Sequence, residues 1–464
     1  MTGLAVVLAF TPFVRAWALQ RKFLDRSTQF HSGHTRLVPR FGGAALFLAF
    51  SLLFLLIRLG VDRHAIPAES SVIFWTCLAM FILGLWDDLR SIDARVKLLI
   101  QIGIAFWAFK GGLQVGRFQN PFTHQIHLMG WLDGPVTVLW LIGVTNLVNL
   151  VDGIDGLAAG LVLVLMILLA IVSASAGSVF SLLIAMGMCG ATSAFLFFNF
   201  PPARIFMGDG GAYFLGLLIA EMALFNSNKG TIAAALTVPF FALGIPIIDT
   251  SFAIIRRFLI GLPLFRADRR HIHHRLVAMG FSQRHVVLLL YGGCAFFALL
   301  GLAVLIQNGR LLPILFGVFM LAMLLSARVF GFVSGWYKLG RVLTDSVMRR
   351  KQTRYALLLG QLLEMDAERC ATMEDLWKEF GLLVGRLRMQ GVEWHRGDEV
   401  WRYGRASGSD LFVVDHTFRN ETGEKMLFSC ATDQWEFETF RLLTELATES
   451  WLRAAHRWEH LQKA

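Results

Sequence analysis

Two adjacent acids, Asp87 and Asp88, follow a long apolar stretch and precede Lys97 by about ten residues. Neighbouring carboxylates repel each other unless a cation neutralises them. Either Lys97 does so, or a metal ion does. A site made only of oxygen ligands favours Mg²⁺, which is usually held by one or two carboxylates together with substrate phosphates. This segment therefore predicts a site for a cation and a phosphate.

A second acidic segment contains Asn149, Asp152 and Asp155, three residues apart, and each aspartate is followed by a glycine. On a continuous helix these side chains would share one face. The glycines favour a break instead, where backbone amides and carbonyls can come close to a ligand. Two ordinary Asp-Gly turns are the alternative interpretation.

The third segment surrounds Asp209, which has Gly208 before it and Gly210 after it. Backbone amides exposed by glycines can bind an anion, and Asp209 could also ligate a metal beside that anion. Phe206 offers an aromatic face at the same place. The commoner role of such an aromatic residue is an anchor at the membrane interface.

The fourth segment, residues 268–275, contains His271, His273 and His274 among arginines that include Arg275. A zinc site is one interpretation of the histidines, but no cysteine or acid at suitable spacing completes a tetrahedral set of ligands. Histidine and arginine both donate to phosphate oxygens. A basic loop attracted to anionic lipid would explain the arginines and not the histidines. Together the four segments predict a site that handles a diphosphate.

The elements that must position these residues are membrane helices. Hydrophobic residues make up 56% of the 464 residues and charged residues 16%, with a mean hydropathy of +0.58. These values exclude a disordered chain and fit an ordinary soluble protein poorly. The apolar stretch 156–203 is long enough for two helices, with a break near 173–178. About eleven helices are predicted to span the membrane, at 2–20, 41–57, 70–86, 98–112, 134–151, 156–203 (two), 211–227, 230–248, 285–309 and 311–327.

Charge gives the orientation of these helices. Residues 1–335 contain 24 of the 43 Lys and Arg but only 13 of the 33 acids. The loops 21–40, 87–97, 204–209 and 256–284 hold roughly 16 of those basic residues, against about six in the opposite loops. By the positive-inside rule, the first group is cytoplasmic and the N-terminus is outside. Many of the thirteen acids lie in the cytoplasmic loops or at the helix ends that border them, among them Asp87, Asp88, Asp93, Asp152, Asp155, Asp209 and Asp268.

After Tyr337 the amino-acid composition becomes typical of a soluble domain. The pattern predicts a helix at 370–389, strands near 392–403, 409–418 and 424–432, and a helix at 434–461. The chain is thus expected to be an all-α polytopic membrane protein (1–335), a linker (336–368) and a small cytoplasmic α+β domain (369–464). That domain shows no catalytic motif, which favours an interaction or regulatory module whose partner is unknown.

These four segments, in this order and at this spacing, resemble the polyprenyl-phosphate N-acetylhexosamine-1-phosphate transferase family over roughly residues 20–290. The resemblance implies transfer of a sugar-1-phosphate from a UDP-sugar to undecaprenyl phosphate, with release of UMP, to initiate a cell-envelope polysaccharide. It implies Mg²⁺ (or Mn²⁺) as cofactor and an active site on the cytoplasmic face of a bacterial inner (plasma) membrane. The expected partners are the two substrates and the bilayer, with no nucleic acid; a homodimer is compatible with the sequence.

The resemblance also implies roles for individual residues. Asp209 corresponds to the principal metal ligand, with Asn149 sharing it, and Asp155, Phe206 and Asn199 correspond to the uracil pocket. The implied catalytic residues are Asp87, Asp88, Lys97, Asp152, His271, His273 and His274; the implied substrate-binding residues are His34, Asp155, Asn199, Phe206 and Arg275; the implied metal ligands are Asp209 and Asn149.

The histidine segment, followed by Arg275 and Leu276, is similar to the GlcNAc-1-phosphate branch, with the phospho-MurNAc-pentapeptide transferases as the alternative. The first cytoplasmic loop departs from the family pattern because it lacks a proline and an Arg-Lys pair. Arg36 or Arg40 could supply the missing charge. Asp249 falls in a recurrent family position without a sharper role.

Two rival functions share some of these sequence features. In a transporter, acids near the bilayer centre couple ions to the substrate, and only Glu221 suits that role. Glu221 could equally be a buried, paired packing residue. The CDP-alcohol phosphotransferases also use Asp-Gly motifs with Mg²⁺, but their characteristic spacing is missing from this sequence.

Overall fold

The computed structural model describes residues 1–21, 38–61, 66–119, 126–227, 239–262, 272–307, 310–329, 339–396, 399–404, 411–418 and 424–462. The chain forms two compact units. One contains residues 1–25, 36–253 and 268–334, and the other includes 254–267 and the tail from 335.

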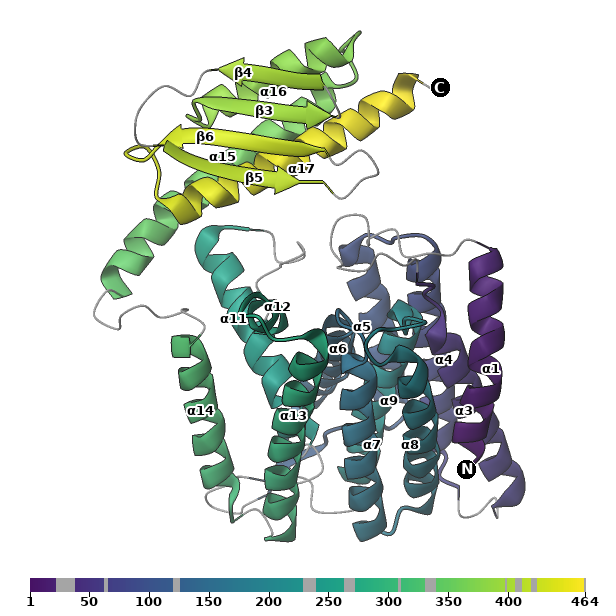
Figure 1. Cartoon of the computed structure of the whole chain (residues 1–464). Coiled ribbons are helices and arrows are strands. Elements are labelled where there is room, and N and C mark those ends of the chain that lie inside the picture. The colour runs from purple at the N-terminus through teal and green to yellow at the C-terminus, as the bar shows by residue number, and fades with distance from the viewer. Residues whose placement is uncertain are drawn as a thin grey trace. The chain divides into compact units, whose positions relative to one another are not determined.

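The first unit is a bundle of helices (Figure 1). Its helices are α1 (Thr2–Gln20), α3 (Gly42–Gly60), α4 (Glu69–Leu89), α5 (Ala94–Lys110), α6 (Asp133–Val151), α7 (Leu157–Ser175), α8 (Val179–Asn199), α9 (Gly208–Ser227), α11 (Gly244–Ile260), α12 (Ile272–Ala278), α13 (Gln283–Ile306) and α14 (Leu312–Val329), with a short hairpin of β1 (Arg117–Gln119) and β2 (Ile126–Leu128) and a 3₁₀ turn at Gly130–Leu132.

Eight helices in the described part of the chain are long and apolar enough to cross a membrane. They correspond to α1, α3, α4, α6 with the preceding turn, α7, α8, α9 and α13. The predicted break in 156–203 is confirmed, because α7 ends at Ser175 and α8 starts at Val179. Of the other three expected spans, α5 and α14 are helices outside this group of eight, and 230–248 lies partly outside the described residues. The total of eleven stays a prediction.

Helix α9 is the centre of the bundle, with α3, α4, α6 and α7 packed against it. About 94% of its spanning window is buried, against 22–67% for the other seven. Small residues allow the close packing. A Cβ on Gly216 of α9 would lie 2.7 Å from the Cα of Thr145 on α6, so only glycine permits this approach. The residues at the start of α9 are consequently held by several helices at once.

The second unit is α+β, as predicted. Its four-stranded antiparallel sheet has the order β4-β3-β6-β5, and α16 and α17 pack on the sheet (Figure 1). Helix α15 packs on α16 and α17. The elements are α15 (Leu339–Asp366), α16 (Met373–Arg386), β3 (Gly391–Arg396), β4 (Glu399–Gly404), β5 (Leu411–Thr417), β6 (Lys425–Ala431) and α17 (Phe437–Gln462).

One strand prediction was wrong in detail. The strand expected over 392–403 is two strands, β3 and β4, paired with Arg396 opposite Glu399. The sequence Gly397-Asp398 between them is rich in turn-forming residues, a signal that the single-strand interpretation overlooked. Helix α15 occupies most of the segment expected to be a linker, and its Leu359 and Leu363 are buried in the core of this unit. The domain boundaries themselves stay a prediction.

Candidate functional site

The end of α4 and the start of α9 meet at the acidic residues. A Cβ on Gly84 of α4 would lie 2.4 Å from the backbone oxygen of Asp209, and one on Gly43 of α3 would lie 2.3 Å from the backbone nitrogen of Gly211. Two helices, α3 and α4, therefore approach the first turn of α9 more closely than any side chain would allow. Gly208 has φ +76°, a left-handed conformation that favours glycine.

Asp88 caps the start of α9. Its carboxylate oxygens accept hydrogen bonds from the backbone N–H of Asp209 (2.9 Å) and of Gly210 (3.0 Å). The first amides of a helix have no partner within the helix, and its N-terminus carries a partial positive charge, so a carboxylate is stabilised there. The sequence placed these residues 121 positions apart in two separate motifs, and the structure joins them directly.

Asp87 turns to a different partner. Its carboxylate accepts from the Lys97 Nζ at 2.5 Å and from the backbone N–H of Ile92 at 2.9 Å. Its side chain also hydrogen-bonds to that of Asp209. Of the two ways to neutralise the acidic pair, the structure shows Lys97 beside Asp87. Two carboxyl groups in contact must share a proton or a cation, so a bound cation is one way to stabilise Asp87 beside Asp209.

Asp155 and Asn199 tie two loops together. The Asp155 carboxylate accepts from the backbone N–H of Ala203 at 2.9 Å. The Asn199 side chain accepts from the backbone N–H of Gly156 at 3.0 Å and donates to the backbone oxygen of Ile205 at 2.9 Å. Both side chains are almost fully buried. These contacts position the 152–156 and 200–206 loops; the expected role of both residues at uracil stays a prediction.

The strand-like segment before α3 lies beside Phe206. The Phe206 N–H donates to the Pro39 oxygen, and the Gly42 N–H donates to the Phe206 oxygen, both at 2.9 Å. Arg40 pairs with Phe206 in a parallel bridge, and its charge acts on both Asp88 and Asp152. Arg40 is thus placed where a cation in the altered first loop was expected, while Arg36 and His34 lie outside the described residues.

Asp152 follows the last turn of α6, next to Asn149, and its backbone N–H donates to the Asn149 oxygen at 3.1 Å. The residue as a whole is half-buried, but its carboxyl group is removed from water. This desolvation and the negative charge of Asp88 raise the pKa of Asp152 well above its usual range, and Arg40 partly opposes them. A bound cation would stabilise the charged form of this carboxyl group.

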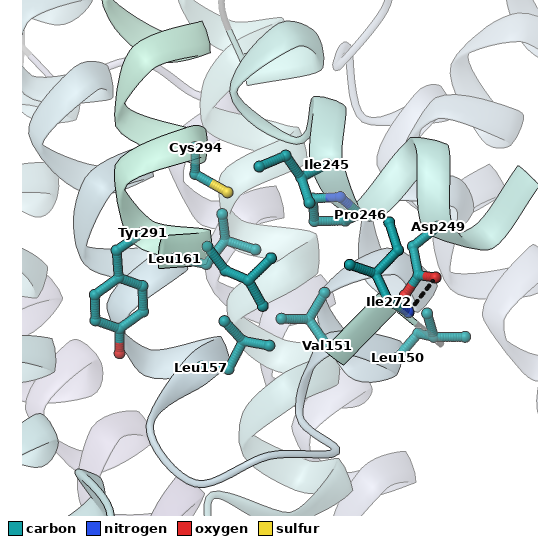
Figure 2. Close-up of a pocket in the computed structure, with 11 residues that line it drawn as sticks. Leu150, Val151, Leu157, Leu161, Ile245, Pro246, Asp249, Ile272, Tyr291 and Cys294 are labelled. Atoms are coloured by element: carbon teal, nitrogen blue, oxygen red, sulfur yellow. Dashed lines mark hydrogen bonds between the residues drawn. The ribbon is translucent and has the colours of Figure 1, made fainter. Parts of the chain in front are cut away.

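The histidine segment is held at its start by Asp249. The Asp249 carboxylate accepts from the Ile272 N–H, the first amide of α12, at 2.9 Å (Figure 2). His273, His274 and Arg275 lie on α12; the side chains of the two histidines, and the whole of His271, lie outside what the structure describes. This gives Asp249 the local role that the sequence could not assign.

A pocket lies between the end of α6, the start of α7 and helices α11, α12 and α13 (Figure 2). Its lining is mostly aliphatic: Leu150, Val151, Leu157, Leu161, Ile245, Pro246, Asp249, Ile272, Leu290, Tyr291 and Cys294. The Tyr291 hydroxyl donates to the Gly156 oxygen, so the pocket wall also supports the 152–156 loop. Tyr291 lies on α13, and from the start of the same helix Arg284 Nε donates to the Pro201 oxygen at 2.9 Å.

Sequence reasoning missed the supporting roles of Arg284 and Tyr291. The available signal was weak. Tyr291 is one of five tyrosines and lies in an otherwise apolar stretch, where a hydroxyl needs a partner. Its partner could only be found from the fold, because Gly156 lies 135 residues earlier.

The residues that meet here fit Mg²⁺ in donor chemistry, because Asp87, Asp152 and Asp209 offer only oxygen ligands. The described residues contain no group of three or more His, Cys, Asp or Glu side chains already arranged around a metal position. Asn149, the second expected ligand, is half-buried in the last turn of α6. Its side-chain role stays a prediction.

Comparison with known proteins gives a family. The model of glycosyl transferase family 4 matches residues 70–227, which include Asp87, Asp88, Asp152 and Asp209. A probable undecaprenyl-phosphate N-acetylglucosaminyl 1-phosphate transferase from Bacillus subtilis is 36% identical over 293 residues, covering 63% of this chain and 80% of that protein. The chain belongs to glycosyl transferase family 4.

Other relatives of this chain carry two kinds of name. An undecaprenyl-phosphate alpha-N-acetylglucosaminyl 1-phosphate transferase from Thermotoga maritima is 28% identical, over 63% of this chain and 86% of its own length. A phospho-N-acetylmuramoyl-pentapeptide-transferase from Shouchella clausii is 29% identical, over 64% of this chain and 93% of its own length. The expected family is therefore confirmed, and its two expected branches are both represented among the relatives.

Proposed function

We propose that this protein transfers GlcNAc-1-phosphate from UDP-GlcNAc to undecaprenyl phosphate, giving undecaprenyl-diphosphate-GlcNAc and UMP. The names of the Bacillus and Thermotoga relatives support both substrates. One observation carries the proposal: residues from two separate sequence motifs are in direct contact, because Asp88 of α4 caps the first turn of α9 beside Asp209. This places carboxylates, helix amides and Lys97 within one site.

The reaction requires one bond to form and one to break. An oxygen of the lipid phosphate attacks the phosphorus attached to the sugar, and the bond from that phosphorus to the bridging oxygen of the diphosphate breaks, releasing UMP. A phosphate monoester has a second pKa near roughly 6, so most of the lipid phosphate is dianionic at neutral pH. A protein base is then unnecessary, and catalysis consists mainly of positioning and charge neutralisation.

Residues of this chain supply both the positioning and the charge neutralisation. Lys97 and Arg40 bring positive charge to the acids, and the amides at the start of α9 are fixed by Asp88. Asp209, with Asn149, would hold Mg²⁺ (or Mn²⁺), which neutralises diphosphate charge when bound. The loops carrying Asp155 and Phe206 suit a nucleotide, and the histidine segment on α12 suits phosphate or sugar.

The aliphatic pocket between α6, α7, α11 and α13 suits the first isoprene units of the lipid. Such a lining is what an isoprenoid chain requires, and it adjoins the 152–156 loop through Tyr291. We further propose eleven spans, an outside N-terminus and a cytoplasmic active site in a bacterial inner (plasma) membrane. The product would initiate a cell-envelope polysaccharide. The tail would bind a partner still to be identified.

The test is an assay of UMP release by the purified full-length protein with undecaprenyl phosphate and a panel of UDP-sugars. UDP-GlcNAc should give the highest rate, and the rate should depend on added undecaprenyl phosphate. Chelation with EDTA should abolish turnover, and Mg²⁺ should restore it. Turnover of UDP-MurNAc-pentapeptide alone would contradict the choice of sugar, and activity that persists in EDTA or in Asp209→Asn would contradict the metal role.

A further inference from the structure

Helix α15 has apolar side chains on two different faces. On one face, Ala356, Leu359 and Leu363 are buried in the core of the second unit, where α15 packs on α17. The other face is exposed to solvent over its whole described length. Its five large apolar side chains have exposed fractions between 44% and 60%, at Met348, Tyr355, Leu358, Leu362 and Met365. Single exposed apolar residues are common on protein surfaces, but five along one helix face are not.

The spacing of this exposed face is regular. Together with Lys351, the five residues define the α15 stripe, in which consecutive positions are separated by three and four residues in alternation. This is the period of 3.5 that keeps a seam facing a second helix in a coiled coil. The stripe covers 18 residues, about 26 Å of helix.

We propose that the α15 stripe pairs with the same stripe of a second copy of this chain. A two-fold axis makes one surface complementary to itself, so a single stripe is sufficient for both partners. Pairing would cover the apolar side chains without using the opposite face, which the core of the second unit already occupies. The pairing is independent of the transferase reaction proposed above.

Charge favours an antiparallel arrangement of the two helices. In a parallel pair, Lys351 would face the same lysine of the other copy inside the seam, and like charges there are unfavourable. In an antiparallel pair centred between Ala356 and Leu357, Lys351 lies opposite Leu362 and near the end of the helix that carries Asp366. Met348 then lies opposite Met365, and Tyr355 opposite Leu358.

Cysteine cross-linking of the full-length protein in lipid nanodiscs tests both the pairing and its direction. We expect the Met348→Cys/Met365→Cys protein to form a covalent dimer under mild oxidation at least ten times faster than the wild type, which controls for the five native cysteines. Met348→Cys alone should stay at the wild-type rate, because the two copies of this position are about 26 Å apart in an antiparallel pair.

A third substitution supplies the matched control. Adding Leu358→Asp within the stripe should abolish the cross-link, whereas adding Gln361→Asp, at an exposed position beside the stripe, should leave it. Because both positions are exposed, neither change should lower the unfolding temperature. Absence of the cross-link in the double variant, or its persistence with Leu358→Asp, would overturn the proposal. Protection of a cysteine at Leu358 from water-soluble maleimide by the bilayer alone would overturn it too, and would make the membrane the partner.

Discussion

Replacement of Gly84 by alanine tests whether the contact between α4 and α9 builds the active site. The added Cβ would lie 2.4 Å from the backbone oxygen of Asp209 and 2.6 Å from the Cα of Gly210. Ordinary contacts begin near 3.4 Å. Since the blocking atoms belong to the backbone, no side chain can rotate away, and the two helices must separate by about 1 Å.

That separation breaks the cap on α9. The bond from the Asp209 N–H to Asp88 would lengthen from 2.9 Å to about 3.9 Å, beyond hydrogen-bonding distance. Misplacement of catalytic groups by about 1 Å can lower a rate by about 10²-fold. We therefore expect kcat/KM for UMP release to fall by about two orders of magnitude, or about 2.7 kcal/mol of transition-state stabilisation. Overpacking should also destabilise the bundle by about 1–3 kcal/mol.

Gly143→Ala is the matched control. Gly143 lies in α6, another candidate span, and a Cβ there would meet no atom within 4 Å. The same substitution in open space should leave the rate of UMP release near the wild-type value and favour the helix slightly. Both variants are assayed in nanodiscs after their unfolding temperatures are measured. If folded Gly84→Ala protein were as active as Gly143→Ala protein, the reasoning that this close contact positions the acids would be refuted.

Three further predictions concern other side chains. Asp249→Asn keeps an oxygen that can accept from the Ile272 N–H and should retain much more UMP-release activity than Asp249→Ala; equal losses would show that charge matters rather than the cap. Glu221→Gln should keep most of the transferase activity, because Glu221 is fully buried in α9 and bonded to Thr76; loss of turnover with an unchanged melting temperature would favour an ion-coupling role. Thr372→Ala removes the capping box of α16 and should lower the stability of the second unit by about 1 kcal/mol, measured by hydrogen exchange in α16. The hydrogen bond from Thr372 lowers the pKa of Asp375, so the part of the capping box made by the Asp375 carboxylate should be fully present above the ordinary carboxyl pKa. That part should be lost as the pH falls through the lowered value, and exchange in α16 that does not change with pH would contradict this.

Glu221 shows how the fold decides between functions that the sequence left open. Its position in an apolar helix suited a transporter or a packing residue equally well. The structure places it at full burial, where it accepts hydrogen bonds from Thr76 (2.6 Å) and Cys77 (3.4 Å) of α4. A buried acid with two partners within the bundle fits the packing role.

Local patterns were sufficient for the elements. The apolar stretches predicted the described spanning helices, and the alternation of Met426, Phe428 and Cys430 predicted β6, because burial on one face of a helix or a strand repeats with a fixed period. Two features were missed. The strands β3 and β4 are short, so each shows only a few repeats of the pattern. In α15 the apolar residues are divided between two faces of the helix, which hides the repeat.

The sequence by itself determined which residues could do chemistry, because acids are rare in an apolar region and those present must have partners. It also determined the family, since four motifs occur in one order. Only the tertiary structure decided what each residue touches. Asp88 caps a helix that starts 120 residues later, Asn199 joins two loops, and Asp249 holds α12. The Asp88 contact depends on how closely α3 and α4 approach α9 at Gly43 and Gly84. The number of residues between two positions does not give the distance between them in space.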